Sequence, residues 1–62
     1  MKKTFDKMIA EMRQYADNKG YKGSLYDLFL WQNYEEQMYF MRDYGLNTLS
    51  KRKKFWEYLK NF

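Results

Sequence analysis

The chain has 62 residues, a net charge of +4, and no cysteine, histidine or proline. A chain of this length forms one small domain, so we expect residues 1–62 to fold as a single unit. Without cysteine or histidine, disulfide bridges, thiol nucleophiles and zinc staples are excluded, and the commonest proton-shuttling side chain is missing.

The composition predicts an all-α protein. Valine is absent, and the β-branched residues that strands favour are limited to Thr4, Ile9 and Thr48. The three glycines, at positions 20, 23 and 45, fall between predicted helices. We therefore predict a compact three-helix bundle.

The first helix is predicted from Thr4 to Lys19, with Thr4 as its N-cap and Asp6 in the first turn. Gly20 and Tyr21 should then form a Schellman ending, in which the tyrosine packs back on the last turn. Six apolar residues have the spacing of one buried helix face: Phe5, Met8, Ile9, Met12, Tyr15 and Ala16.

The second helix is predicted from Ser24, which resembles an N-cap, to Tyr44. Gly45 and Leu46 form its expected Schellman ending. One face carries Tyr26, Leu30, Tyr34, Met38, Met41 and Tyr44.

An alternative is a break near Gln32 and Asn33, which would produce four short helices. Asn33 is a good N-cap and is followed by the acidic pair Glu35 and Glu36. The sequence leaves the choice between one long helix and two short ones open.

The third helix is predicted to begin after Asn47 or Thr48 and to run to about Asn61. Its core side is predicted to consist of Leu49, Phe55, Trp56, Leu59 and Phe62. Its solvent side is predicted to consist of Lys53, Lys54, Glu57, Lys60 and Asn61.

Catalytic patterns are missing from the sequence. Ser24 and Ser50 have no evident base nearby and suit helix starts, while Glu35 and Glu36 are adjacent and project about 100° apart on a helix. The carboxylates lack metal-ligand spacing, and no glycine-rich phosphate loop is present. We expect no enzyme activity, no cofactor and no metal.

Four consecutive cations, residues 51–54, occupy the start of the third helix. Each cation there is disfavoured by about 0.3–1 kcal/mol, because the helix dipole is positive at that end. The same geometry attracts anions. We predict a nucleic-acid phosphate site formed by Asn47, Thr48, Ser50, Lys51, Arg52, Lys53, Lys54 and Lys60. Trp56 and Tyr58 are candidates for stacking on bases, and Lys19 and Lys22 are candidates to join the patch.

Two other interpretations of this basic run stay open. In the first, the run keeps an aromatic-rich protein soluble and pairs with Asp43, Glu36 or Glu35 of the acidic middle segment. In the second, the run docks a protein partner.

The chain contains 14 aromatic residues and five methionines, more than a core of this size usually holds. Bulky side chains compensate for a short chain, so they can simply form the core. Alternatively, an aromatic face docks a protein partner or a second copy of the chain. The candidate residues for that face are Leu25, Phe29, Tyr39 and Phe40.

Membrane insertion is not expected, because the longest apolar runs have four residues and a span needs about 20. No apolar signal region follows the basic start, so we expect a cytoplasmic protein. The lysine, asparagine and tyrosine bias is typical of AT-rich phages and mobile elements. The working hypothesis is a non-enzymatic, phage-type accessory module that binds nucleic acid. The alternative is a small protein-binding regulator.

Overall fold

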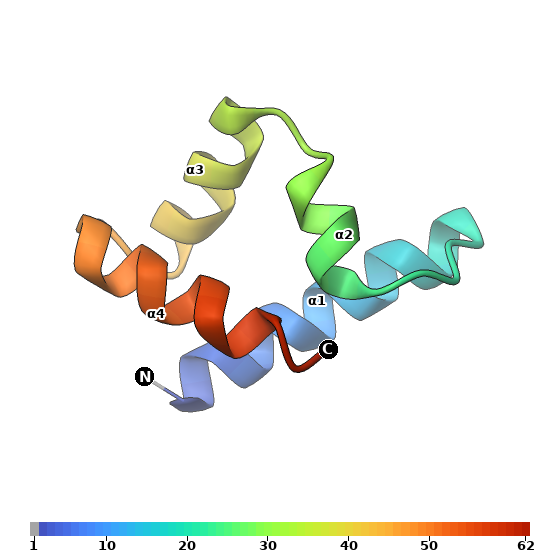
Figure 1. The fold of residues 1–62 in the computed structure, drawn as a ribbon, viewed down its shortest axis with the longest axis horizontal. Helices are drawn as coiled ribbons and strands as arrows, with labels where there is room; N and C mark the ends of the chain where they lie inside the picture. Colours follow the sequence, from blue (N-terminus) through green and yellow to red (C-terminus); the bar gives the residue numbers. More distant parts are fainter. Residues whose placement is uncertain (1) are drawn as a thin grey trace.

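The part of the chain that the structure describes contains four helices, and side-chain N-caps start three of them. The computed structural model describes the backbone of residues 2–62 and the side chains of residues 3–62. The helices are α1 (Lys2–Lys19), α2 (Leu25–Leu30), α3 (Tyr34–Asp43) and α4 (Leu49–Leu59), as Figure 1 shows. The described residues contain no strand, and the predicted all-α fold is confirmed.

Glycines end α1 and α3 in the predicted way. Gly20 and Gly45 have φ angles of 71° and 82°, a region that residues with a Cβ atom rarely adopt. After each glycine, the next backbone N–H bonds to the carbonyl oxygen five residues earlier, at 2.9 Å. This is the Schellman pattern, and it turns the buried side chain of Leu46 into the core.

The N-caps are partly as predicted. Ser24 Oγ accepts the N–H of Asp27 at 3.1 Å, and Thr48 Oγ1 accepts the N–H of Lys51 at 3.3 Å. The prediction that Thr4 caps α1 is wrong, because α1 already includes Lys2. Lysine is a good helix former, so nothing in residues 2 and 3 prevents the helix from starting before Thr4.

The predicted continuous helix from Ser24 to Tyr44 is wrong, and the alternative break is confirmed. Asn33 Oδ1 accepts the N–H of Glu36 at 2.9 Å and starts a new helix. Gln37 Nε2 donates to two carbonyl oxygens at the end of α2, at 2.8 and 3.1 Å. One side chain on α3 thereby bonds to the Phe29 carbonyl in the last turn of α2 and to the Gln32 carbonyl in the turn that follows, which ties the two short helices together.

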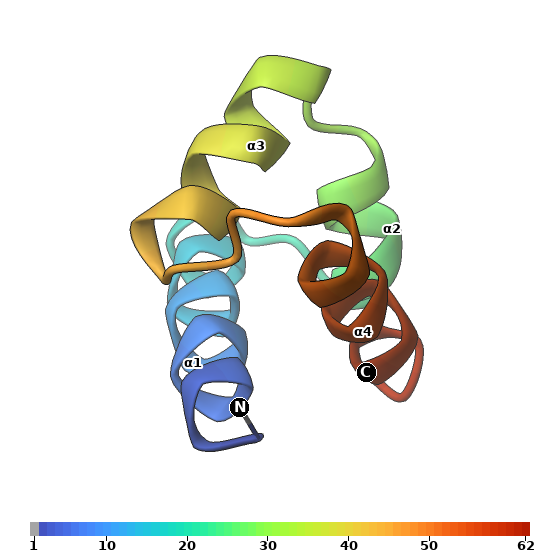
Figure 2. The same cartoon turned by 90° about the vertical axis from the view of Figure 1, so that its left-hand side faces the viewer.

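The helices form two levels, visible in two perpendicular views (Figures 1 and 2). α1 and α4 run side by side in the same direction, and α2 and α3 form an inverted V above them. The Cα radius of gyration is 10.9 Å. A folded chain of this length is expected to have about 10.6 Å, so the described residues are about as compact as a globular domain of this size.

The core lies where the V meets α1 and α4. Phe55 of α4 is completely buried, and its ring centroid lies 5.5 Å from that of Phe5 and 5.8 Å from that of Phe29. Phe29 also contacts Trp56 at 5.0 Å. The buried residues are Phe5, Met8, Ile9, Met12, Ala16, Leu25, Phe29, Met41, Leu46, Phe55 and Leu59.

Several residues predicted as core are exposed. Leu49 is 64% exposed and Phe62 is 37% exposed, and α4 ends at Leu59 rather than near Asn61. Leu30 and Tyr34 are also exposed, because the break at Asn33 changes the register of the face that they were predicted to share. Tyr15, at 42% exposed, lies at the edge of the buried stripe of α1.

Candidate nucleic-acid interface

The basic start of α4 is held in place by the loop before it. Gly45 turns the chain out of α3, and Thr48 caps α4. Arg52 Nε then reaches back to the carbonyl oxygen of Leu46 at 3.0 Å. Arg52 is half-buried and satisfies a loop acceptor, so one of the four consecutive cations has a structural role.

The three lysines of the run are exposed. Lys53 and Lys54 line a shallow hollow with Leu49, Ser50 and Glu57 on the outer side of α4. Ser50 is exposed beside them. These side chains can reach solvent without disturbing the core.

Lys51 lies on another side of the same helix turn. It lines a small hollow of about 160 Å³ with Thr4 of α1 and with Tyr44 and Gly45 at the end of α3. Lys51 thereby links the basic run of α4 to the start of α1.

Among the described side chains, the only ion pair joins Lys60 Nζ to Glu57 Oε1, at 3.1 Å. The pairing with Asp43, Glu36 or Glu35, which belongs to one of the open interpretations of the basic run, is therefore not seen in this part of the chain. Lys60 differs from the other candidate lysines, because its charge is partly compensated by its neighbour one turn earlier.

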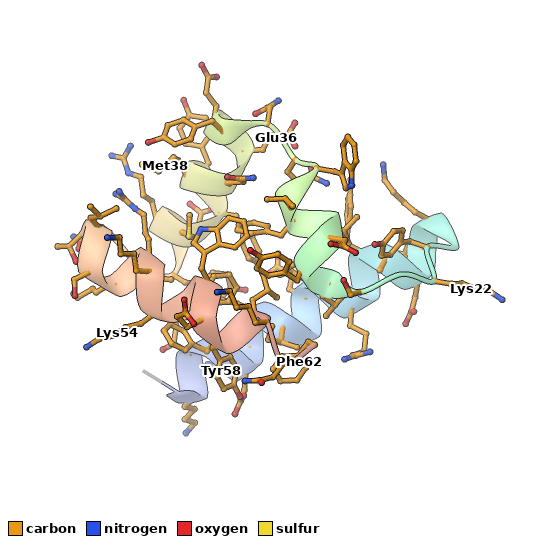
Figure 3. The ribbon with its side chains drawn as sticks, viewed as in Figure 1. Lys22, Glu36, Met38, Lys54, Tyr58 and Phe62 are labelled. Carbon is orange, nitrogen blue, oxygen red and sulfur yellow. The ribbon has the colours of Figure 1, made fainter. Side chains whose placement is uncertain are left out.

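The beginning of α1 extends the basic end of the molecule. α1 and α4 both start at the same end, on the left in Figure 1 and toward the viewer in Figure 2. Exposed Lys3 belongs to this first turn of α1. Lys22 lies at the opposite end from Lys54 (Figure 3), and Lys19 ends α1 just before it, so neither joins the patch.

The remaining residues of the predicted site have mixed positions. Asn47 is exposed, and Thr48 is exposed but uses its hydroxyl oxygen to cap α4. Trp56 is half-buried, with its ring centroid 5.4 Å from that of Tyr26. The hydroxyl of Tyr58 donates to Asp6. Both aromatic side chains are thus engaged within the fold, and base stacking by Trp56 and Tyr58 stays a prediction.

The predicted aromatic docking face is divided between core and surface. Leu25 and Phe29 are each 4% exposed and belong to the core, so they are not available to a partner. Phe40 is half-buried, 5.7 Å from Phe29 between ring centroids, and Tyr39 is 60% exposed. Of the four candidates, only Tyr39 presents most of its side chain to solvent.

A more exposed apolar group lies at the corner between α2 and α3. Trp31 is 85% exposed, Tyr34 72% and Leu30 54%. The sequence pattern predicts that these residues belong to one continuous helix and that Leu30 and Tyr34 lie on its main apolar face. The one signal in the sequence that indicates this exposure is the N-cap residue Asn33, because a helix break there places Trp31 in the connecting turn.

The described residues provide no group of three or more acidic side chains able to hold a metal ion. None of the helices in this described part is both long and apolar enough to cross a bilayer. Comparison with known proteins found no matching family model, no matching curated protein and no matching solved structure. Function is therefore inferred from the side chains of this chain alone, and the phage-type origin stays a prediction.

Proposed function

We propose that the protein is a non-enzymatic module that contacts nucleic-acid phosphates through the start of α4. The supporting observation is that Lys51, Lys53 and Lys54 are exposed and form no ion pair within the described residues. They surround a helix start, where free backbone N–H groups and the helix dipole add to their positive potential. A bound phosphate relieves the repulsion among these lysines.

The expected binding is electrostatic and tolerant of sequence. Three lysines that each neutralise one phosphate of duplex DNA predict a slope of about −2.7 for the logarithm of affinity against the logarithm of salt concentration. Because Trp56 and Tyr58 are engaged within the fold, we expect little contribution from base stacking. Duplex DNA and duplex RNA should therefore bind with similar affinity.

The test compares two double variants in fluorescence-anisotropy titrations with labelled duplexes. Lys51→Glu with Lys53→Glu should abolish binding, whereas Lys19→Glu with Lys22→Glu should retain most of it. Each change of lysine to glutamate lowers the charge by two, so both variants have a net charge of zero, against +4 in the unaltered chain. Equal loss in both variants, or no binding by the unaltered chain at low salt, would overturn the proposal.

Unfolding does not confound this comparison. Both changed side chains are exposed, and glutamate at position 51, in the first turn of α4, is favoured by about 0.3–1 kcal/mol, so the variant at α4 should fold about as well as the unaltered chain. Circular dichroism melting curves check this point for both double variants.

We propose as a second candidate that the corner between α2 and α3 docks a protein, in the simplest case a second copy of the chain. The supporting observation is the exposure of Leu30, Trp31 and Tyr34 at one turn. Sedimentation equilibrium should then show a dimer that Trp31→Ser dissociates and Tyr39→Ser weakens. A monomer at all concentrations would exclude self-association through this corner.

A further inference from the structure

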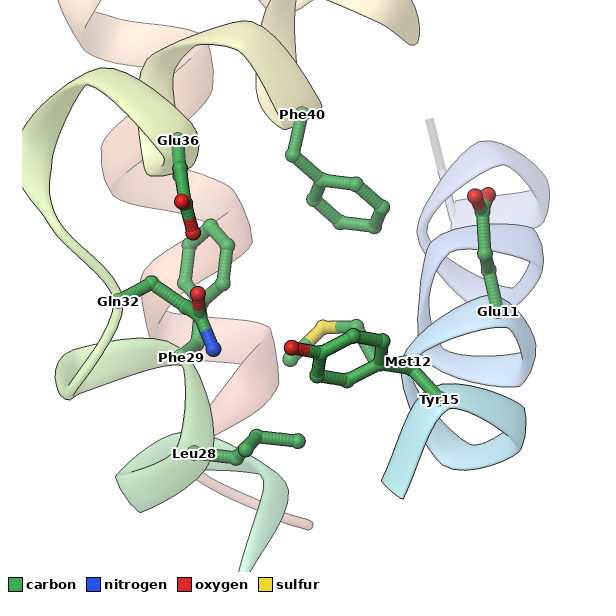
Figure 4. A pocket seen from close by; sticks show the side chains of 8 residues that line it. All are labelled: Glu11, Met12, Tyr15, Leu28, Phe29, Gln32, Glu36 and Phe40. Carbon is green, nitrogen blue, oxygen red and sulfur yellow. The ribbon is translucent and has the colours of Figure 1, made fainter. Parts of the chain in front are cut away.

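A cleft of about 210 Å³ lies between α1, α2 and α3, away from the basic start of α4. Its apolar walls include Met12 of α1, Phe29 of α2 and Phe40 of α3. Figure 4 shows the ring of Tyr15 entering from the α1 side, with its hydroxyl directed across the opening. The cleft is too small for a drug-sized ligand, which needs at least about 300 Å³, but it accommodates one small group.

Two carboxylates stand at the rim on facing helices. Glu11 projects from α1 and Glu36 from α3, on opposite sides of the opening in Figure 4. The Glu11 carboxylate accepts a hydrogen bond from the hydroxyl of Tyr44, which fixes its position between α1 and α3. The rim is therefore negative on both sides, although the protein as a whole is positive.

A lysine of α1 that does not itself line the cleft contacts one of the rings that do. Lys19 Nζ lies 4.9 Å from the centroid of the Tyr15 ring, within the range of a cation–π contact. Tyr15 is the main cause that raises the pKa of Lys19 above 10.5, and the charge of Glu36 adds to the effect. Two residues of the cleft, the ring of Tyr15 and the carboxylate of Glu36, thus already favour a positive charge beside them.

We propose that this cleft binds a small quaternary ammonium group of the choline class. Its cation would lie against the rings of Tyr15 and Phe40 with its methyl groups on the apolar wall, between the carboxylates of Glu11 and Glu36. A quaternary ammonium is weakly hydrated and needs no hydrogen-bond acceptors, so an apolar wall can replace its water shell. A primary ammonium would lose hydrogen bonds to water there.

Choline and its neutral isostere 3,3-dimethylbutan-1-ol have the same shape and differ in charge. Comparing their affinities therefore distinguishes recognition of the cation from simple filling of the apolar cleft. Titrated into ¹⁵N-labelled protein at low salt, choline should produce saturable shifts in the amide signals of Tyr15, Gln32 and Phe40. The isostere should bind at least about threefold more weakly, as expected for one cation–π contact. Equal affinity for the two compounds, no shifts with choline, or tighter binding of n-butylammonium would overturn the proposal.

Matched variants test which carboxylate contributes to choline binding. Glu36→Gln should weaken choline binding about two- to fivefold, whereas Glu35→Gln, the same change one residue earlier and outside the cleft, should not. The backbone N–H of Glu36, rather than its side chain, bonds to Asn33, so the start of α3 is retained. Lys19→Met should strengthen binding, because it removes the internal competitor for Tyr15. Equal effects of Glu35→Gln and Glu36→Gln, or weaker binding by Lys19→Met, would contradict the assignment.

Discussion

The hydroxyl of Tyr58 donates a hydrogen bond to the carboxylate of Asp6, joining residues that are 52 positions apart in the sequence. The Tyr58 ring also lies 5.5 Å from that of Phe5, between centroids, so the contact ties α4 to the first turns of α1. Because Tyr58 belongs to the last turn of α4, this link fixes the C-terminal end of that helix against the beginning of α1.

Tyr58→Phe should lower the midpoint of thermal unfolding by a small amount, because it removes the hydrogen bond and keeps the ring contact. Tyr39→Phe is the control, since Tyr39 is 60% exposed. Both midpoints can be measured by circular dichroism. Equal midpoints for the two variants would show that the bond to Asp6 adds nothing to stability.

Alkaline pH should destabilise the protein through two tyrosines. Hydrogen bonds to Glu11 and Asp6, respectively, raise the pKa values of Tyr44 and Tyr58 above 10.0, and desolvation adds to both shifts. The folded state holds these protons more tightly than the unfolded state. Their stabilising contribution is therefore complete below pH 10.0 and is lost as the pH rises through the raised pKa values.

Urea unfolding at stepped pH measures this effect. The free energy of unfolding should fall above pH 10.0 in the unaltered chain, and less steeply in the double variant Tyr44→Phe with Tyr58→Phe. If the free energy of unfolding depends on pH in the same way in both proteins, the two tyrosines are not the cause of the alkaline destabilisation. The lysines, which also titrate at high pH, are the same in both proteins and cancel in this comparison.

Asn33→Ala should destabilise the protein by about 1 kcal/mol, because it removes the oxygen that accepts the N–H of Glu36 at 2.9 Å. Asn33→Ser keeps a capping oxygen and should lose much less. Urea unfolding of both variants provides the comparison. An equal loss would mean that the cap is not what starts α3.

Gly45→Ala should cost about 1–2 kcal/mol, because φ at this position is 82° and an L-residue is strained there. A Cβ atom at Gly45 would meet nothing within 4 Å, so the cost is conformational rather than steric. D-alanine introduced by chemical synthesis should fold without loss. Destabilisation by D-alanine to the same extent would refute this explanation.

Phe55→Ala should unfold the protein, since removing a buried phenylalanine costs about 3–5 kcal/mol, comparable to the whole stability of a domain this small. Leu49→Ala on the same helix should change the free energy of unfolding by less than about 0.5 kcal/mol, because Leu49 is 64% exposed. The periodicity of the sequence assigns both residues to the core, so similar losses would support the sequence prediction over the structure.

Helix identity and most helix ends follow from the sequence alone. The endings at Gly20 and Gly45 and the caps at Ser24 and Thr48 involve residues a few positions apart, and short-range interactions of this kind are readable without tertiary contacts. The break at Asn33 was readable only as an alternative, because its capping signal competes with an apolar pattern that continues through it.

Tertiary structure decided which apolar and charged side chains are exposed to solvent and which are engaged within the fold. Periodicity says which residues share a helix face, but burial depends on neighbours that are distant in sequence. Phe29 is covered by α3 and α4, whereas Trp31 two residues later meets nothing comparable and is 85% exposed. In the same way, the return of Arg52 to the Leu46 carbonyl and the cleft between Glu11 and Glu36 exist only once the four helices have packed, because each depends on where the turns direct the chain.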